Sequence, residues 1–466
     1  MDCSCDLNDS SVFDTSDMEL ECYSLMDCAA DHSVSTYVPR ETHDENSGFR
    51  TGSHKDPFDN VPEEILHNIF QFLDPPALLT AADVCKRFRD AVGQKVKSFE
   101  LDMCPCSKRE EYAGRLIVRL HNLRSLDLSA PSCRSFLTSN TQITGFATSL
   151  AASCRKIESF TLLGVRGARV LRVYVHSLGE AAKVKHLSLD IQRAAIGCAT
   201  SLQHVSRHVN LTSLTLSSNL SIRRCSRTRD VLSQLFAQLL PGITCLILQF
   251  VETDMDITSL AVSHTSGLRY FAADNITDQS LATLAQQNPD IESLKIAASS
   301  ESLKQLFRFP NLHKLWIHIP ADEDIEAEDV EEAFGAEPLK SQLRMLAVRG
   351  CLSSDPLRGI SLLSHLEVLV VDRCGQLLYE KSDHKYKRML RLKHMVILTS
   401  FRTSFAAPPP PAPAQRSSGE VLKLFPSLGT IRFTDCEFNI KDNFSFRRVI
   451  TPAQDIESLF TLSATS

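Results

Sequence analysis

The sequence lacks the features that would mark it as an exported or membrane protein. No apolar run reaches the ~18 residues that a transmembrane helix needs, and Met1 to Leu20 contain no Lys or Arg that could start a signal peptide. The 15 cysteines are spread along the chain rather than clustered. We therefore expect a protein of the cytosol or nucleus, without a membrane partner, whose cysteines stay as thiols.

Signatures of catalysis, metal binding and nucleic-acid binding are missing as well. The chain has no Gly-rich phosphate loop, no HExxH and no serine elbow flanked by glycines. Cys3 and Cys5 have no second Cys or His pair at ligand spacing, so we expect no metal and no other cofactor. The formal net charge of -6 provides no basic footprint for a nucleic acid. These absences predict a chain without a catalytic site of its own.

What the sequence does contain divides it into three parts. Residues 1–55 are rich in Ser, Asp, Thr and Cys without any period, which predicts a disordered leader. Residues 56–100 have a helical pattern, and residues 101–466 have a repeat. Within the repeat we predict two insertions. The acidic stretch 321–338 should be a solvated loop or a short acidic helix, and the proline-rich stretch 404–420 should be extended.

The pattern of residues 56–100 predicts three short helices. Asp59 or Asn60 can cap the first helix, and Pro62 suits its first turn. Asp74, Pro75 and Pro76 end that helix and start a second. A third helix is expected from about Val84. Apolar residues recur at helical spacing, in the first helix at Ile65, Leu66, Ile69, Phe70 and Leu73, and in the third at Val84, Phe88 and Val92.

These residues resemble the F-box family over roughly 40 residues. The resemblance rests on Val61-Pro62, Ile65-Leu66, Ile69-Phe70, Leu73, the Pro-x-x-Leu-Leu turn at Leu78-Leu79, and Val84-Cys85-Lys86 followed by Phe88. Val61, Ala77 and Phe88 depart from the commonest residues of the family. The resemblance implies docking on a Skp-type adaptor, which links to cullin and RING subunits.

The adaptor-binding residues that the resemblance implies are Val61, Pro62, Ile65, Leu66, Ile69, Phe70, Leu73, Leu78, Leu79, Val84, Cys85 and Phe88. The alternative is that these side chains only form the core of a small helical domain. Three helices of this length cannot enclose all of these apolar residues, which favours a partner.

The rest of the chain repeats a six-residue phrase, apolar-x-x-apolar-x-apolar, which resembles the strand of a leucine-rich repeat. The phrase begins at Val96, Leu123, Ile157, Val184, Leu211, Ile243, Leu268, Ile291, Leu312, Leu343, Leu366, Leu392 and Leu428. Because apolar triplets also arise by chance, we expect between about ten and thirteen repeats. The predicted fold class is α/β, a small three-helix F-box followed by a curved leucine-rich-repeat solenoid with parallel strands inside and helices outside.

Strand side chains alternate, so the third and fifth residues of each phrase should point away from the core, where they can contact a substrate. In the early repeats these residues are small, polar or acidic: Ser125, Asp127, Ser159, Thr161, His186, Ser188, Ser213 and Thr215. Later ones are larger: Ile247, Tyr270, Lys295, Lys314, Trp316, Met345, Val368 and Val370. The candidate substrate-binding residues are Tyr270, Lys295, Lys314, Trp316, His318 and Arg349. The alternative for Trp316 is packing beneath the acidic insertion.

The two resemblances together imply a function. They predict the substrate-recognition subunit of a Skp-cullin-F-box ubiquitin ligase, which binds an unknown protein substrate and contributes no catalytic residue. One alternative is an F-box/repeat scaffold with a structural role outside degradation. Another is a catalytic ligase in which a thiol such as Cys133 or Cys154 carries ubiquitin.

Overall fold

The chain divides into two compact units, residues 1–60 and 61–466, and every helix and strand named below belongs to the second. The computed structural model describes residues 58, 60–73, 75–102, 120, 122–129, 156–163, 184–190, 211–218, 226–250, 257–320, 323, 325–350, 356–372, 389–398, 425–428, 430–433, 436–439 and 445–448. The expected leader 1–55, the proline-rich segment 404–420, Cys133 and Cys154 lie outside these residues.

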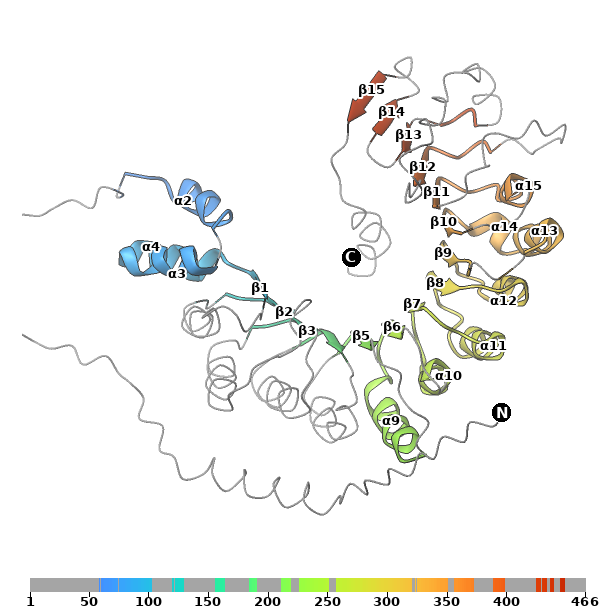
Figure 1. The fold of residues 1–466 in the computed structure, drawn as a ribbon, viewed down its shortest axis with the longest axis horizontal. Helices are drawn as coiled ribbons and strands as arrows, with labels where there is room; N and C mark the ends of the chain where they lie inside the picture. The colour runs from blue at the N-terminus through green and yellow to red at the C-terminus, as the bar shows by residue number, and fades with distance from the viewer. Residues whose placement is uncertain are drawn as a thin grey trace, which may run out of the picture. The chain divides into compact units, whose positions relative to one another are not determined.

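The described strands form one sheet whose order follows the chain from β1 to β15 (Figure 1). Their bounds are β1 Ser98–Asp102, β2 Ser125–Ser129, β3 Ser159–Leu163, β4 His186–Asp190, β5 Ser213–Ser218, β6 Cys245–Phe250, β7 Tyr270–Ala273, β8 Ser293–Ala297, β9 Lys314–His318, β10 Met345–Arg349, β11 Val368–Asp372, β12 His394–Leu398, β13 Thr430–Phe433, β14 Cys436–Asn439 and β15 Ser445–Arg448. Strands β1 to β13 pair in parallel, and each begins at the third residue of a predicted phrase. All thirteen phrases are therefore strands.

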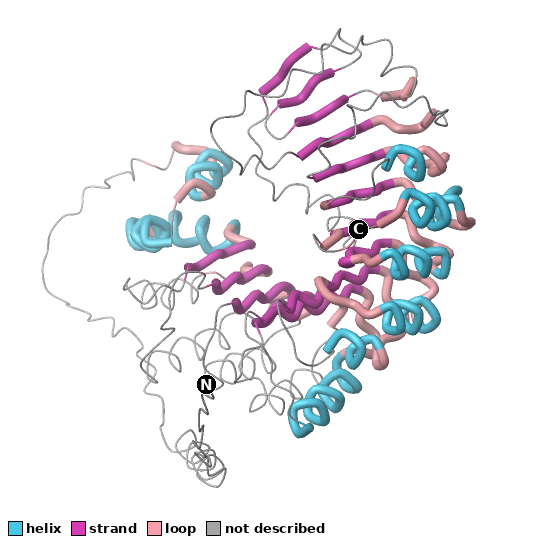
Figure 2. The backbone as a smooth tube through the Cα atoms, turned by 45° about the vertical axis from the view of Figure 1, so that its right-hand side comes forward, coloured by secondary structure: helices cyan, strands magenta, loops and turns pink. Residues whose placement is uncertain are grey.

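Helices connect the strands where the structure describes the connections. They are α9 Ser226–Leu239, α10 Ile257–Val262, α11 Asp278–Gln287, α12 Ser300–Gln305, the short 3-10 helix Leu306–Arg308, α13 Ala327–Gly335, α14 Leu339–Gln342 and α15 Pro356–Ile360. Figure 2 shows the helices from α9 to α15 on the same side of the sheet. This strand and helix arrangement confirms the predicted α/β solenoid.

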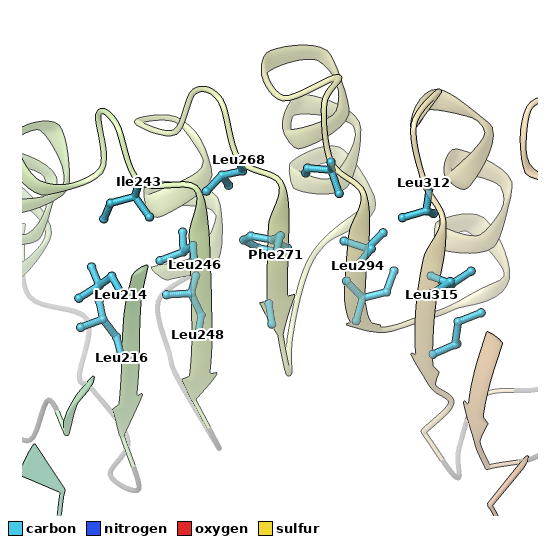
Figure 3. Close-up of a cluster of buried hydrophobic side chains, with 14 of the residues drawn as sticks. Leu214, Leu216, Ile243, Leu246, Leu248, Leu268, Phe271, Leu294, Leu312 and Leu315 are labelled. Carbon is cyan, nitrogen blue, oxygen red and sulfur yellow. The ribbon is translucent and has the colours of Figure 1, made fainter. Parts of the chain in front are cut away.

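The main core lies between the sheet and these helices. Where the structure describes their side chains, the first, fourth and sixth residues of the phrases enter it or pack against it, as Leu312, Leu315 and Ile317 do in the repeat of β9. Equivalent side chains of successive strands lie next to one another in rows (Figure 3). Each repeat therefore covers the apolar face of the next, which is why such units are stable only when stacked. We call the opposite face of the sheet, formed by the third and fifth residues of each phrase, the open face.

The acidic segment 321–338 contains the short acidic helix that was one of its two predicted forms, but this helix is not an insertion at the edge of the array. The helix is α13, which lies between β9 and β10 and packs against α12 and α15. Val330, Ala333 and Phe334 are buried in the main core, while the acidic residues Glu328 and Glu332 are exposed. The spacing of the three buried residues is that of an amphipathic helix. The segment is therefore the helix of its own repeat.

The end of the sheet differs from the predicted repeat. Strand β14 pairs with β13 in the antiparallel direction, and β15 pairs with β14 in the same way. No phrase of the repeat begins in this region, so the sequence pattern did not predict these two strands. The last parallel strand, β13, is therefore not an exposed edge, because an antiparallel pair continues the sheet beyond it.

Gly350 follows β10 and has a φ of +100°, a conformation that only glycine adopts easily. A Cβ at this position would lie 2.5 Å from the carbonyl oxygen of Ile319. We expect Gly350→Ala to lower the free energy of unfolding by about 2 kcal/mol or more, because backbone strain and a collision act together. Gly242→Ala is the matched control, since Gly242 has a φ of +90° but no atom within 4 Å of the added Cβ. Equal losses of thermal stability in the two variants would contradict this explanation.

Candidate functional site

The three helices that precede the repeats are α2 Glu63–Phe70, α3 Pro75–Val84 and α4 Lys86–Lys95. Helix α2 begins later than predicted. Pro62, not Asp59 or Asn60, is its N-cap residue, and the Pro62 carbonyl accepts hydrogen bonds from the amides of Ile65 at 3.1 Å and Leu66 at 3.3 Å. A proline suits this position because the amide it lacks would have no partner inside the helix.

The helices share a core of their own side chains. Phe70 of α2 and Phe88 of α4 meet edge to face, with ring centroids 5.4 Å apart. Leu66 of α2 and Leu78 of α3 are buried with them, and this group is continuous with the main core of the repeats. Four of the twelve predicted adaptor-binding residues therefore hold the helices together instead of facing outward.

The start of α4 explains the place of Cys85. The Cys85 Sγ accepts a hydrogen bond from the amide of Phe88 at 3.4 Å, so Cys85 is the N-cap residue of this helix. Val84 was expected on one stripe of the third helix, together with Phe88 and Val92. It ends α3 instead, and its side chain is 58 % exposed. The stripe of α4 that enters the core consists of Phe88, Ala91 and Val92.

Helix α2 presents a stripe of exposed apolar side chains. Ile65 is 49 % exposed, Ile69 is 48 % exposed, and Phe72, just past the end of the helix, is 87 % exposed. At 100° per residue, these positions point in nearly the same direction, away from the buried Leu66 and Phe70. We call Pro62, Ile65, Ile69, Phe72 and Val84 the exposed helical face. Exposed apolar side chains aligned on one side of a helix, as on α2, are typical of a protein contact.

Three of the other predicted adaptor-binding residues are only partly exposed. Val61, Leu73 and Cys85 are half-buried and pack against the core. Leu79 lies in α3, and its side chain is outside the described part of the chain. Phe72 was missed by the sequence analysis, although it stands seven residues after Ile65, the spacing of one helical stripe.

A second candidate site lies on the open face of β9 to β12. Trp316, Ala347, Val370 and Val396 occupy the fifth position of successive phrases and are in register. With Met345 and Val368 they form an apolar cluster that is separate from the main core. Phe334 of α13 belongs to the main core on the other face, so Trp316 does not pack beneath the described helix of the acidic segment.

Two lysines border this cluster on its β8 side. The Nζ of Lys295 lies 4.6 Å from the centre of the Trp316 ring, a cation–π geometry. Lys314 is half-buried, and burial lowers the pKa of its ammonium group, which Glu292 opposes in part. The Lys314 ammonium group is therefore only partly hydrated, and it lies next to an apolar surface.

The structure groups most, but not all, of the six predicted substrate-binding residues. Lys295, Lys314 and Trp316 lie on β8 and β9, and the exposed His318 and Arg349 are register partners at the ends of β9 and β10. Tyr270 is buried and belongs to another small cluster with Cys245 and Ala272. Met345, Val368 and Val370 contribute to the apolar cluster but were not among the six. They are third or fifth residues of their phrases, so their position could have identified them.

The open face of the first strands has a different character, with Asp127 of β2 in register with Glu100 of β1. Burial raises the pKa of the Asp127 carboxyl, and the charge of Glu100 raises it further. A carboxyl with a higher pKa in the folded state binds its proton more tightly there. Its ionisation therefore lowers stability as the pH rises through that raised pKa.

We therefore expect Asp127→Asn to raise the thermal midpoint at neutral pH. This gain should shrink as the pH falls, and it should vanish below the ordinary pKa of aspartate, where the carboxyl is protonated in both states. Asp230→Asn, at an exposed position of α9, is the control and should change little. An equal gain in both variants, or a gain that grows in acid, would contradict the explanation.

Two other kinds of site do not occur among the described residues. Within those residues, no group of three or more His, Cys, Asp or Glu side chains is arranged to hold a metal ion. None of the helices there is long and apolar enough to span a bilayer.

One known protein family matches the part of the chain that contains α2, α3 and α4. Residues 58–95 match the family described as F-box-like. A search of curated protein sequences found no significant match.

Solved structures similar to this chain have low sequence identity. Rad7 in the yeast Rad7–Elc1 complex is 12% identical, with a TM-score of 0.40 over 74% of this chain and 91% of that chain. The leucine-rich repeat-containing protein LegL7 of Legionella pneumophila is 16% identical, with a TM-score of 0.37 over 65% of this chain and 91% of that chain.

The family match covers the three helices that carry the exposed helical face, and the parallel strands behind them follow the predicted phrase of the repeat. Residues 58–95 are therefore an F-box-like domain, and the elements that follow it form a leucine-rich-repeat solenoid.

Proposed function

We propose that this protein is the substrate-recognition subunit of a Skp-cullin-F-box ubiquitin ligase. The observation that carries the proposal is the exposed helical face within the F-box-like domain. In this proposal a Skp-type adaptor covers that face and connects the chain to cullin and RING subunits, while the repeats bind a protein substrate. Such a complex forms in the cytosol or nucleus.

The size of the exposed helical face indicates how the adaptor binds. Covering the exposed parts of Ile65, Ile69 and Phe72 contributes on the order of 4 kcal/mol, before the loss of translational and rotational entropy is subtracted. That amount alone supports only weak association. We therefore expect the adaptor to contact Val84 at the end of α3 as well, which widens the contact beyond one helix.

The proposed role requires no catalytic residue in this chain. A substrate held on the repeats and a conjugating enzyme held by the RING subunit belong to one assembly, so their effective concentration is high. Ubiquitin transfer then depends on the distance between a substrate lysine and the enzyme, and the proposed protein acts by setting that distance.

Reconstitution with purified components tests the proposal. The full chain is mixed with a cullin and RING pair, with and without a Skp-type adaptor, and complexes are separated by size. We expect the chain to join the cullin only when the adaptor is present. Cullin binding without the adaptor, or no complex with any Skp homologue, would contradict the proposal.

Two alternatives predict other outcomes. If the chain is a scaffold outside degradation, its repeat-bound partner keeps the same half-life after the chain is removed from cells, whereas the ligase proposal expects that half-life to lengthen. If the chain is itself a catalytic ligase, ubiquitin forms a thioester on it that thiols reduce. Replacement of Cys133 and Cys154 would then abolish ubiquitin transfer.

A further inference from the structure

The open face changes its chemistry along the sheet. At the third and fifth positions of β1 to β5, the only charged side chains besides His186 are Glu100 and Asp127, a formal charge of -2 with His neutral. The same positions of β8 to β12 contain Lys295 and Lys314 and no carboxylate, a formal charge of +2. The apolar cluster lies only in this second half. The two halves of the open face therefore favour partners of opposite charge.

The apolar cluster is buried at its centre and partly exposed at its margin. Ala347 is 2 % exposed and Val370 is 3 % exposed, whereas Trp316, Met345, Val368 and Val396 around them are half-buried. In the row of fifth positions, the small Ala347 stands between the larger Trp316 and Val370. Aromatic and aliphatic surface with this pattern is typical of the centre of a protein interface.

Cations stand beside this cluster on two sides. Lys295 and Lys314 border it toward β8, and Arg349 lies two residues past Ala347 on β10, in register with His318 of β9 and with Asp372 of β11. The carboxylate of Glu292 lies before the start of β8 and forms an ion pair with Arg269, with an N–O distance of 3.8 Å. A partner with carboxylates next to an apolar side chain would complement both parts of this surface.

We propose that the open face of β8 to β12 docks an acidic segment of the protein substrate, with one bulky apolar side chain on the cluster and carboxylates beside Lys295 and Lys314. This inference rests on the proposed function and deepens it, because it names the class of segment that the ligase selects. Five strands about 4.8 Å apart span about 19 Å, the length of roughly six extended residues. A short linear segment is therefore sufficient to cross the surface.

The chain provides its own probe for this proposal. Trp316 is the single tryptophan of the sequence and lies in the cluster, so its fluorescence reports directly on the docking surface. The ligands are pools of peptides of about eight residues, which are long enough to cross the five strands. They lack tryptophan, have Leu or Phe at the centre, and contain Asp and Glu, Asn and Gln, Lys and Arg, or phosphoserine as flanking residues. The purified full chain is titrated with each pool.

We expect only the pool with Asp and Glu to bind and to shift the Trp316 emission, with binding that weakens as salt is added. Lys295→Glu with Lys314→Glu should lower the affinity at least about tenfold. With a labelled peptide as readout, Trp316→Ala should lower it about thirtyfold, as for a central interface residue. The control is Thr161→Glu with Thr215→Glu, which adds two carboxylates to the acidic half, in the same row of fifth positions as Lys295, and should leave binding unchanged.

Several results would overturn the proposal. The proposal fails if the acidic pool does not bind, if the Asn and Gln pool binds equally well, or if the chain prefers the basic or the phosphoserine pool. It also fails if the Thr161 and Thr215 control variant loses as much affinity as the lysine variant. Self-association of the chain that Trp316→Ala abolishes would assign the surface to a second copy instead. The titration needs no adaptor, so its outcome is independent of adaptor binding and separates failure of this inference from failure of the ligase proposal.

Discussion

Replacing both Ile65 and Ile69 by aspartate is expected to weaken adaptor binding by at least about 100-fold, because each isoleucine should act as a buried anchor of the interface. The two side chains are half-exposed on α2 and point away from the core, so the new carboxylates remain in water in the free protein. In a complex they would be buried without partners, which is strongly unfavourable. Titration of the purified adaptor against wild type and variant measures the effect.

Gln71→Asp is the matched control for this experiment. Gln71 is the exposed C-cap residue of the same helix and lies outside the stripe of Ile65, Ile69 and Phe72. The Gln71→Asp substitution introduces the same side chain as the double variant. It should change the adaptor affinity by less than about twofold, as expected for a charge at the rim of an interface. An unchanged affinity of the double variant, with an unchanged thermal midpoint, would exclude the exposed helical face as the adaptor site.

Replacing Phe334 by alanine is expected to have the largest effect on stability. The Phe334 ring is fully buried in α13, and deletion of such a ring lowers the free energy of unfolding by ~3–5 kcal/mol. A solvated loop or edge helix in the acidic segment would lose far less. Chemical denaturation, followed together with hydrogen exchange of the repeats around β9 and β10, measures the loss and its location.

Glu332→Ala provides the control within the same helix. Glu332 is exposed, and a surface substitution of this kind should change stability by no more than about 0.5 kcal/mol. If both variants lost the same small amount, α13 would not be part of the repeat core. A large loss for Phe334→Ala alone would confirm that acidic residues cover the outside of an ordinary repeat helix.

The repeat could be predicted well because its signal is periodic. Each phrase places three apolar residues where a strand must cover the core, and the same spacing returns in every repeat. The strands β14 and β15 could not be predicted, because their antiparallel pairing follows no such repeat. A short helix was one of the two predicted forms of the acidic segment, but its place in the repeat was not predicted, because the prediction rested on the charges and not on the spacing of Val330, Ala333 and Phe334.

The candidate sites could be predicted only in part, because the sequence pattern shows neither which apolar side chains are buried nor which strands are neighbours. The F-box resemblance identifies which residues belong to the three helices, but not which side chains the helices enclose. Burial separates Leu66 and Phe70 from Ile65 and Ile69, although all four have the same apolar character. On the open face, adjacency across strands depends on the register, which brings Trp316 beside Ala347 over a distance of thirty-one residues. Sequence spacing within one phrase does not contain that information.

Hydrogen exchange of the full chain, measured with and without a purified Skp-type adaptor, tests the central claim most directly. We expect the adaptor to slow exchange in α2, in its end near Phe72 and in the end of α3 near Val84, and to leave the strands from β2 to β13 unchanged. Protection that appears on the repeats instead, or no protection anywhere at saturating adaptor, would contradict the account.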